Sequence, residues 1–284
     1  MRSLWGAWTV ASDRADKRRL DPVAALHAGV AGIGVAWSGA WAVLVLLSLL
    51  IMAPVVVPVS PVFGIGLAVV VALAGLTAAG ALFRIAIDGT VGQARRNGLG
   101  AGGLQFGLVE MRILWGGVLN LLFLSMVLVV LSLVTLAVFG IAELDVAAIQ
   151  ARNWSAVGPM WKLAVLGLVS LAAVMIPVLI LTRLSLWAPA SVGRGKTVSL
   201  NSMGIAHGAF WPLILLWLVI GALAVAIAAV GTAGPLAGRV AAALLVPWIL
   251  APFAAGILGS AYHQLEYWTP DQVDPGIRTL RRIA

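Results

Sequence analysis

Long runs of apolar residues, separated by short polar segments, dominate this chain from end to end. One run without a charged side chain covers the thirty residues between Arg112 and Glu143, and others lie on both sides of it. Because a helix needs about 20 apolar residues to cross the hydrocarbon core of a bilayer, such runs predict membrane-spanning helices. Six spans fit the pattern: 29–53, 62–84, 113–141, 162–183, 209–233 and 240–262.

The predicted fold class is therefore an all-α integral membrane protein. Asp21 followed by Pro22 suits the start of the first helix, because aspartate is a good N-cap and proline needs no hydrogen bond at the first helical position. The chain divides into an N-terminal segment, a six-helix membrane domain and a C-terminal tail: 1–21, 22–262 and 263–284.

The N-terminal segment has an amphipathic pattern. Leu4, Trp8, Ala11 and Ala15 fall on one helical face, and basic residues cluster at the end of the segment. The pattern predicts a helix that lies in the membrane interface. The alternative is a disordered basic tail, which the two tryptophans of the segment disfavour.

Composition supports the membrane assignment. Hydrophobic residues make up 62% of the 284 positions and charged residues only 10%, against about 25% charged in a soluble domain. Cysteine is absent, so disulfides and thiol chemistry are excluded. The net charge is +8, but the basic residues are spread over four short segments, which does not suit nucleic-acid binding.

The basic residues predict the orientation of the spans. Fifteen of the 18 Lys and Arg residues fall on one side of the six-span arrangement, in 1–19, 84–112, 183–196 and 278–282. Since Lys and Arg accumulate in short cytoplasmic loops, both termini are predicted in the cytoplasm.

The stretch Ala190 to Thr197, ASVGRGKT, is close to a nucleotide-binding P-loop but lacks its first glycine. A P-loop joins a buried strand to a helix inside a soluble domain, whereas this stretch follows an apolar helix. We therefore interpret it as a basic, glycine-rich turn at the membrane surface and predict no nucleotide hydrolysis.

Two predicted cytoplasmic connections, 83–115 and 182–211, look alike. Each has an arginine at a helix end, a glycine-rich basic turn and a tryptophan that opens the next span, which suggests a parallel repeat of helix pairs. Neighbouring connections would gather basic side chains into a site for an anionic lipid headgroup, with Thr197 and Ser199 as N-caps of a polar stretch. The six candidates are Arg84, Arg95, Arg96, Arg183, Arg194 and Lys196. The alternative is that these residues only fix the orientation.

Other candidate chemistry is sparse. His27, His207 and His263 all fall near cytoplasmic span ends, so a zinc site with Glu266 or Asp21 is an alternative to three separate interfacial histidines. No closely spaced histidine pair supports a metal, and we predict no cofactor. Arg84 and Asp88 are four residues apart and are predicted to pair on one helix face. No hydrolytic triad or nucleophile elbow is visible, which predicts a protein that is not an enzyme.

The second connection also resembles a known family. Arg183-Leu-Ser-Leu, Pro189-Ala190, a basic turn and Gly208-Ala-Phe-Trp211 are similar to a pattern in uncharacterised six-span bacterial inner-membrane proteins. That family is related to the membrane domain fused to some glycerophosphodiester phosphodiesterases. Its members often have SWRLTRGxFW where this chain has SMGIAHGAFW, so two arginines are missing here. The resemblance implies the fold, the topology and the inner membrane, and it implies no chemistry.

Two functions remain open after this reading. The first is a non-enzymatic membrane protein that acts as a membrane-embedded partner or contacts anionic lipid. The second is a small transporter or permease, for which Pro177 and Pro247 would break spans and Asn120 and Ser125 would line a path. A membrane enzyme that acts on lipid is a third, less supported reading.

Overall fold

The computed structural model describes residues 19–57, 60–141, 145–154 and 159–266. Every regular element in these ranges is a helix, and six helical segments are long and apolar enough to cross a membrane, as predicted. They are α2 (Pro22–Val56), α3 (Pro61–Asp88), α5 (Leu108–Ile141), α7 (Met160–Leu184), α10 (Phe210–Ala233), and the segment α11 (Leu236–Leu245), η2 (Val246–Leu250) and α12 (Ala251–Leu265). The amphipathic helix predicted for 1–21 falls almost entirely outside the described residues.

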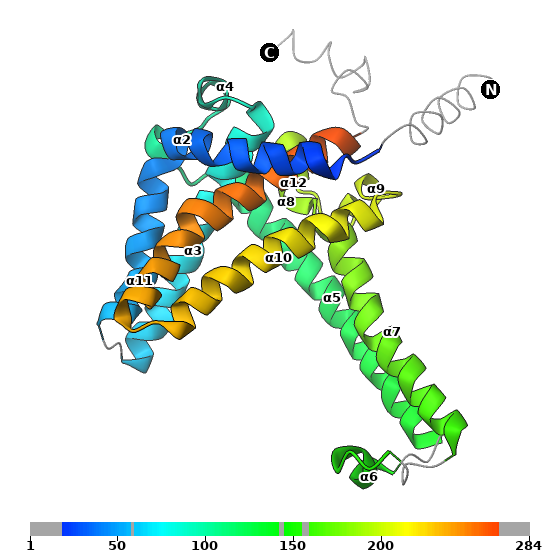
Figure 1. Ribbon diagram of the computed structural model, residues 1–284. Helices are drawn as coiled ribbons and strands as arrows, with labels where there is room; N and C mark the ends of the chain where they lie inside the picture. The colour runs from blue at the N-terminus through cyan, green and yellow to red at the C-terminus, as the bar shows by residue number, and fades with distance from the viewer. Residues whose placement is uncertain (1–18, 58–59, 142–144, 155–158, 267–284) are drawn as a thin grey trace, which may run out of the picture.

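Short helices join the long ones. They are α4 (Val91–Arg96), η1 (Ala101–Gly103), α6 (Val146–Gln150), α8 (Trp187–Gly193) and α9 (Ser202–Ile205). In Figure 1, α4, α8 and α9 lie at one end of the molecule, where both described chain ends also lie, and α6 lies at the opposite end. This arrangement agrees with the predicted alternation of the loops between the two ends of the molecule.

The first helix begins where the sequence predicts, because Asp21 caps it. The Asp21 carboxylate accepts hydrogen bonds from the backbone N–H groups of Val23 and Ala24, and Pro22 occupies the first position. The helix therefore starts seven residues before the predicted span. At the far end of α3, Gly89 adopts a left-handed conformation (φ 72°) that ends the helix.

The core lies where α2, α3 and α12 meet. α12 packs along α2 and also contacts α3, and the buried side chains concentrate in these three helices. By contrast, Figure 1 shows α5 and α7 running together away from the other long helices. Their most apolar stretches contain no buried residue, so this hairpin has the exposed apolar surface of helices that face lipid.

The last span is interrupted, as its prolines suggest. Pro247 lies in the π-helical stretch η2, and Pro252, four residues after Trp248, has no N–H to offer the Trp248 carbonyl. The indole N–H of Trp37 donates to that carbonyl instead (2.8 Å). The Trp248 indole in turn donates to Ser48 Oγ (2.9 Å). Side chains of α2 therefore provide hydrogen-bond partners for both the carbonyl and the indole of Trp248 at the interruption. Pro177, in contrast, lies inside an unbroken α7.

Candidate functional site

Arg84, a member of the predicted anion site, is held in a buried ion pair. Its Nη1 lies 2.5 Å from Glu110 Oε1, and Glu110 Oε2 also accepts from the backbone N–H of Gly107 (2.9 Å). Arg84 is 6% exposed and Glu110 is fully buried. The predicted Arg84–Asp88 pair is therefore wrong. The Asp88 carboxylate accepts from the Asn97 side chain (2.7 Å), and the partner of Arg84 comes from another helix.

Arg194, a second member of the predicted anion site, also forms an ion pair. Its Nε and Nη2 donate to the two carboxylate oxygens of Glu266, at 2.9 and 2.7 Å, in a two-bond pair that joins the end of α8 to the end of α12. Two of the six residues predicted for the anion site thus already have carboxylate partners. Of the others, Arg183 is half-buried and Arg95, Arg96 and Lys196 are exposed.

The glycine-rich turn is approached by a basic residue that the prediction left out. Arg112, near the start of α5, has its Nη1 3.9 Å from the position that a Cβ on Gly195 would occupy. Within the described part of the chain, Arg112 forms no ion pair or hydrogen bond. The side chain is half-buried, and Lys196 follows Gly195 directly.

The turn does not have the geometry of a phosphate-binding loop. The stretch from Ala190 to Gly193 is the end of α8, so the helix precedes the turn instead of following it. The prediction that Thr197 and Ser199 cap a helix is wrong, because α9 begins at Ser202 after Asn201 and has no side-chain cap. The Ser199 carbonyl accepts from the Ser202 hydroxyl instead.

The three-histidine metal site is also wrong. Among the described residues, which include all three histidines, no group of three or more His, Cys, Asp or Glu side chains is placed to hold a metal ion. His27 lies on α2, His207 follows α9, and His263 on α12 is turned toward α3, where its Nε2 lies 2.8 Å from the Ile87 carbonyl. A similar predicted depth in the membrane therefore does not bring the three rings together.

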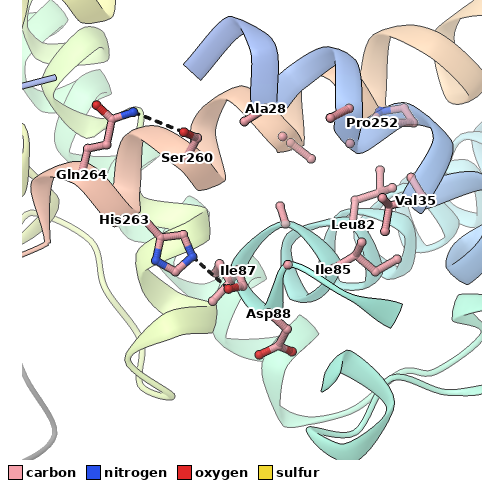
Figure 2. Close-up of a pocket in the computed structure, with 17 residues that line it drawn as sticks. Ala28, Val35, Leu82, Ile85, Ile87, Asp88, Pro252, Ser260, His263 and Gln264 are labelled. Carbon is pink, nitrogen blue, oxygen red and sulfur yellow. Dashed lines mark hydrogen bonds between the residues drawn. The ribbon is translucent and has the colours of Figure 1, made fainter. Parts of the chain in front are cut away.

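A cavity of about 500 Å³ lies between α2, the end of α3 and α12 (Figure 2). Many of its lining residues are alanine or glycine. The lining consists of Ala28, Ala31, Gly32, Val35, Ala36, Leu82, Ile85, Ala86, Ile87, Asp88, Gly89, Pro252, Ala255, Gly256, Ser260, His263 and Gln264. None of the candidate sites predicted from the sequence coincides with this cavity.

The cavity has a polar end and an apolar end. Figure 2 shows Ser260, His263 and Gln264 at one end and Val35 and Leu82 at the other. The polar end coincides with the last turn of α12, since that helix ends at Leu265. From there to Pro252 the cavity follows α12 for twelve residues, or about 18 Å at the α-helical rise.

Glycines set how closely the three helices approach beside the cavity. A Cβ on Gly256 would lie 2.8 Å from the Ala28 carbonyl oxygen, and one on Gly259 would lie 2.7 Å from Ala86 Cβ. Backbone therefore meets backbone where α12 crosses α2. A Cβ on Gly32, in contrast, would be 3.5 Å from its nearest neighbour, which is ordinary contact.

The cavity is lined by a serine, a histidine and an acid, the residue types of a hydrolytic triad: Ser260, His263 and Asp88. Their hydrogen bonds do not form a catalytic triad. Ser260 Oγ accepts from Gln264 (3.2 Å), His263 is bonded to the Ile87 carbonyl, and Asp88 is bonded to Asn97. Activation of a serine requires a direct Ser–His bond oriented by the acid, and none is present among these three residues.

The sequence does contain a pattern that relates to the cavity, namely small residues spaced four positions apart on two spans. Small residues recur every four positions on the first span at 28, 32 and 36, and Gly256 and Ser260 have the same spacing on the last span. Such spacing places the residues on one helix face. It does not by itself reveal that the first and last spans face each other.

Comparison with known proteins gives no match to this chain among family models, curated proteins or solved structures, so the family resemblance of the second connection stays a prediction.

Proposed function

We propose that this protein is a multi-pass membrane protein that binds a lipid-like amphiphile in the cavity between α2, α3 and α12, and that it performs no chemistry on the bound molecule. The observation that carries the proposal is the cavity's division into a polar end at the helix termini and an apolar end along the helices. Its volume of about 500 Å³ is within the range of small-molecule sites, about 300 to 1,000 Å³.

The position of the cavity fits an amphiphile that comes from the bilayer. α2, α3 and α12 belong to three of the apolar segments that can span a membrane, so the tail of a lipid would lie along their apolar side chains. The polar head would lie near His263, which is exposed at the end of α12. No step of this binding requires a nucleophile, a metal or a cofactor.

A cavity-filling variant with a matched control tests the proposal. Gly32→Leu places a branched side chain in the cavity, whereas Gly34→Leu, two residues along the same helix, enters open space outside it. The purified protein is incubated with a fluorescent long-chain alcohol in detergent micelles. We expect saturable binding to wild type and to Gly34→Leu, and strongly reduced binding to Gly32→Leu. Equal binding to both variants, or none to wild type, would refute the proposal.

A second candidate function is contact with anionic lipid at the basic end of the molecule. Arg112 beside the Gly195–Lys196 turn favours it, because two basic residues from different connections then share one surface. Each such residue contributes about 1 kcal/mol of attraction to an anionic surface. Replacing Arg112 and Arg183 by glutamine should lower the preference for anionic over zwitterionic lipid in mixed nanodiscs. A wild-type protein without that preference would exclude this function.

A transporter remains the alternative for the same cavity. The π-helical interruption at Val246–Leu250 favours it, because interrupted spans are common at transport sites, and Pro252 just beyond it lines the cavity. Accelerated movement of a labelled amphiphile between leaflets of proteoliposomes would support transport. Binding without such movement would support the first proposal.

A further inference from the structure

The charges around the cavity restrict the head group that it can take. We infer that the ligand is an amphiphile with a neutral or cationic head, such as a hydroxyl or an amine, and not a phosphate; this inference rests on the proposed function. Among the described residues that line the cavity there is no Lys or Arg, and the only carboxylate is that of Asp88.

Arg84 is the basic residue on α3 that could neutralise the negative charge of Asp88, but it is paired with another carboxylate. Arg84 lies one helical turn before Asp88 on α3, but its guanidinium is paired with the buried Glu110 carboxylate. Within the described ranges, the Asp88 carboxylate accepts a hydrogen bond from the neutral Asn97 side chain and has no cationic partner. A phosphate at the polar end would therefore lie near the Asp88 carboxylate with no described Lys or Arg in the lining to offset it, which is repulsive in a partly desolvated site. An ammonium group would be attracted by the same carboxylate.

The remaining polar groups suit a head that donates hydrogen bonds. His263 Nε2 faces the Ile87 carbonyl, which can only accept, so Nε2 carries the proton and Nδ1 of the neutral ring is an acceptor. Gln264 donates to Ser260 Oγ, and Gln264 Oε1 accepts from the backbone N–H of Asp21 (2.6 Å). The polar end thus offers the Nδ1 acceptor of His263 and the hydroxyl proton of Ser260, and the Asp88 carboxylate beside it adds a negative charge.

Three probes with one tail and different heads test the inference. Oleyl alcohol, oleylamine and oleyl phosphate compete with the fluorescent long-chain alcohol for the purified protein. We expect the Kd of the alcohol and of the amine to be lower than that of the phosphate by a factor of about ten or more. A factor of ten in Kd corresponds to about 1.4 kcal/mol of binding free energy. Asp88→Asn, which keeps the side-chain shape, should weaken oleylamine and strengthen oleyl phosphate. Asp145→Asn, at the cap of the remote α6, should change neither.

The outcomes separate this inference from the proposed function. If all three probes bind wild type equally and none binds Gly32→Leu, the cavity is still a lipid site but the head-group assignment is overturned. Tightest binding of oleyl phosphate would overturn it as well. Absence of binding by every probe would overturn both. Unchanged thermal unfolding of Asp88→Asn would show that any altered preference comes from the lost charge.

Discussion

Replacing Glu110 by glutamine should cost this protein a large part of its stability. The amide has nearly the shape of the carboxylate but no charge, and only its oxygen can accept from Arg84 or Gly107. Arg84 would then be a cation with about nine-tenths of its surface buried and no counter-charge. Removal of one partner of a buried pair costs about 3–5 kcal/mol, against about 0–1 kcal/mol for an exposed pair.

The double variant Arg84→Met/Glu110→Met completes the test. Replacing both charges by apolar groups of similar volume is often nearly neutral, so the double variant should recover most of the stability that Glu110→Gln loses. The assay is reversible unfolding in mixed micelles with increasing SDS, followed by the fluorescence of the 12 tryptophans. A loss below about 1 kcal/mol in Glu110→Gln would refute the reasoning, because it would mean that water screens the pair as at a surface.

Three further predictions concern packing, the interrupted span and topology. Gly256→Ala should destabilise the protein by about 1–3 kcal/mol, because the added Cβ meets the α2 backbone, while Gly32→Ala should change unfolding little; equal effects in the same assay would contradict the packing. Trp37→Phe should cost about 1–3 kcal/mol by removing the indole donor of the Trp248 carbonyl, and the cost should largely disappear in a Pro252→Ala background, where a backbone N–H becomes available. An equal cost in both backgrounds would refute that cause. Reporter fusions at Gly98, Arg194 and Ala284 should give cytoplasmic signals and those at Pro58, Trp154 and Pro235 external ones; a single reversed loop would overturn the six-span orientation.

The spans were predictable from the sequence, whereas the contacts that build the cavity were not. Apolar length alone predicts α5, because thirty uncharged residues are more than a helix needs to cross the hydrocarbon core of a bilayer. The Asp21 cap was predictable for a similar reason, since its partners are the next residues in the chain. Local spacing failed for Arg84, where it predicted Asp88 four residues away and the structure has Glu110 at a distance of 26 residues.

The histidines and the cavity show the same limit. Equal depth in the membrane does not determine which helices are neighbours, so three histidines at one depth were not evidence of a shared site. Conversely, Asp88 and His263 line one cavity although they belong to the second and the last spans. Only the packing of α3 against α12 brings them together, and apolar helices carry little sequence information about their partners.

The pairing of α2 with α12 has a consequence for how the protein is made. Hydrogen bonds between α2 and the segment that contains α12 join residues 211 and 243 positions apart, so α2 is synthesised long before its partner. During synthesis, the face of α2 around Gly32 must therefore remain in contact with lipid or with the insertion machinery until α12 has been made. The cavity comes into existence only when α12 arrives, so a chain that stops before Ala251 contains most of the long apolar helices but lacks one wall of the cavity.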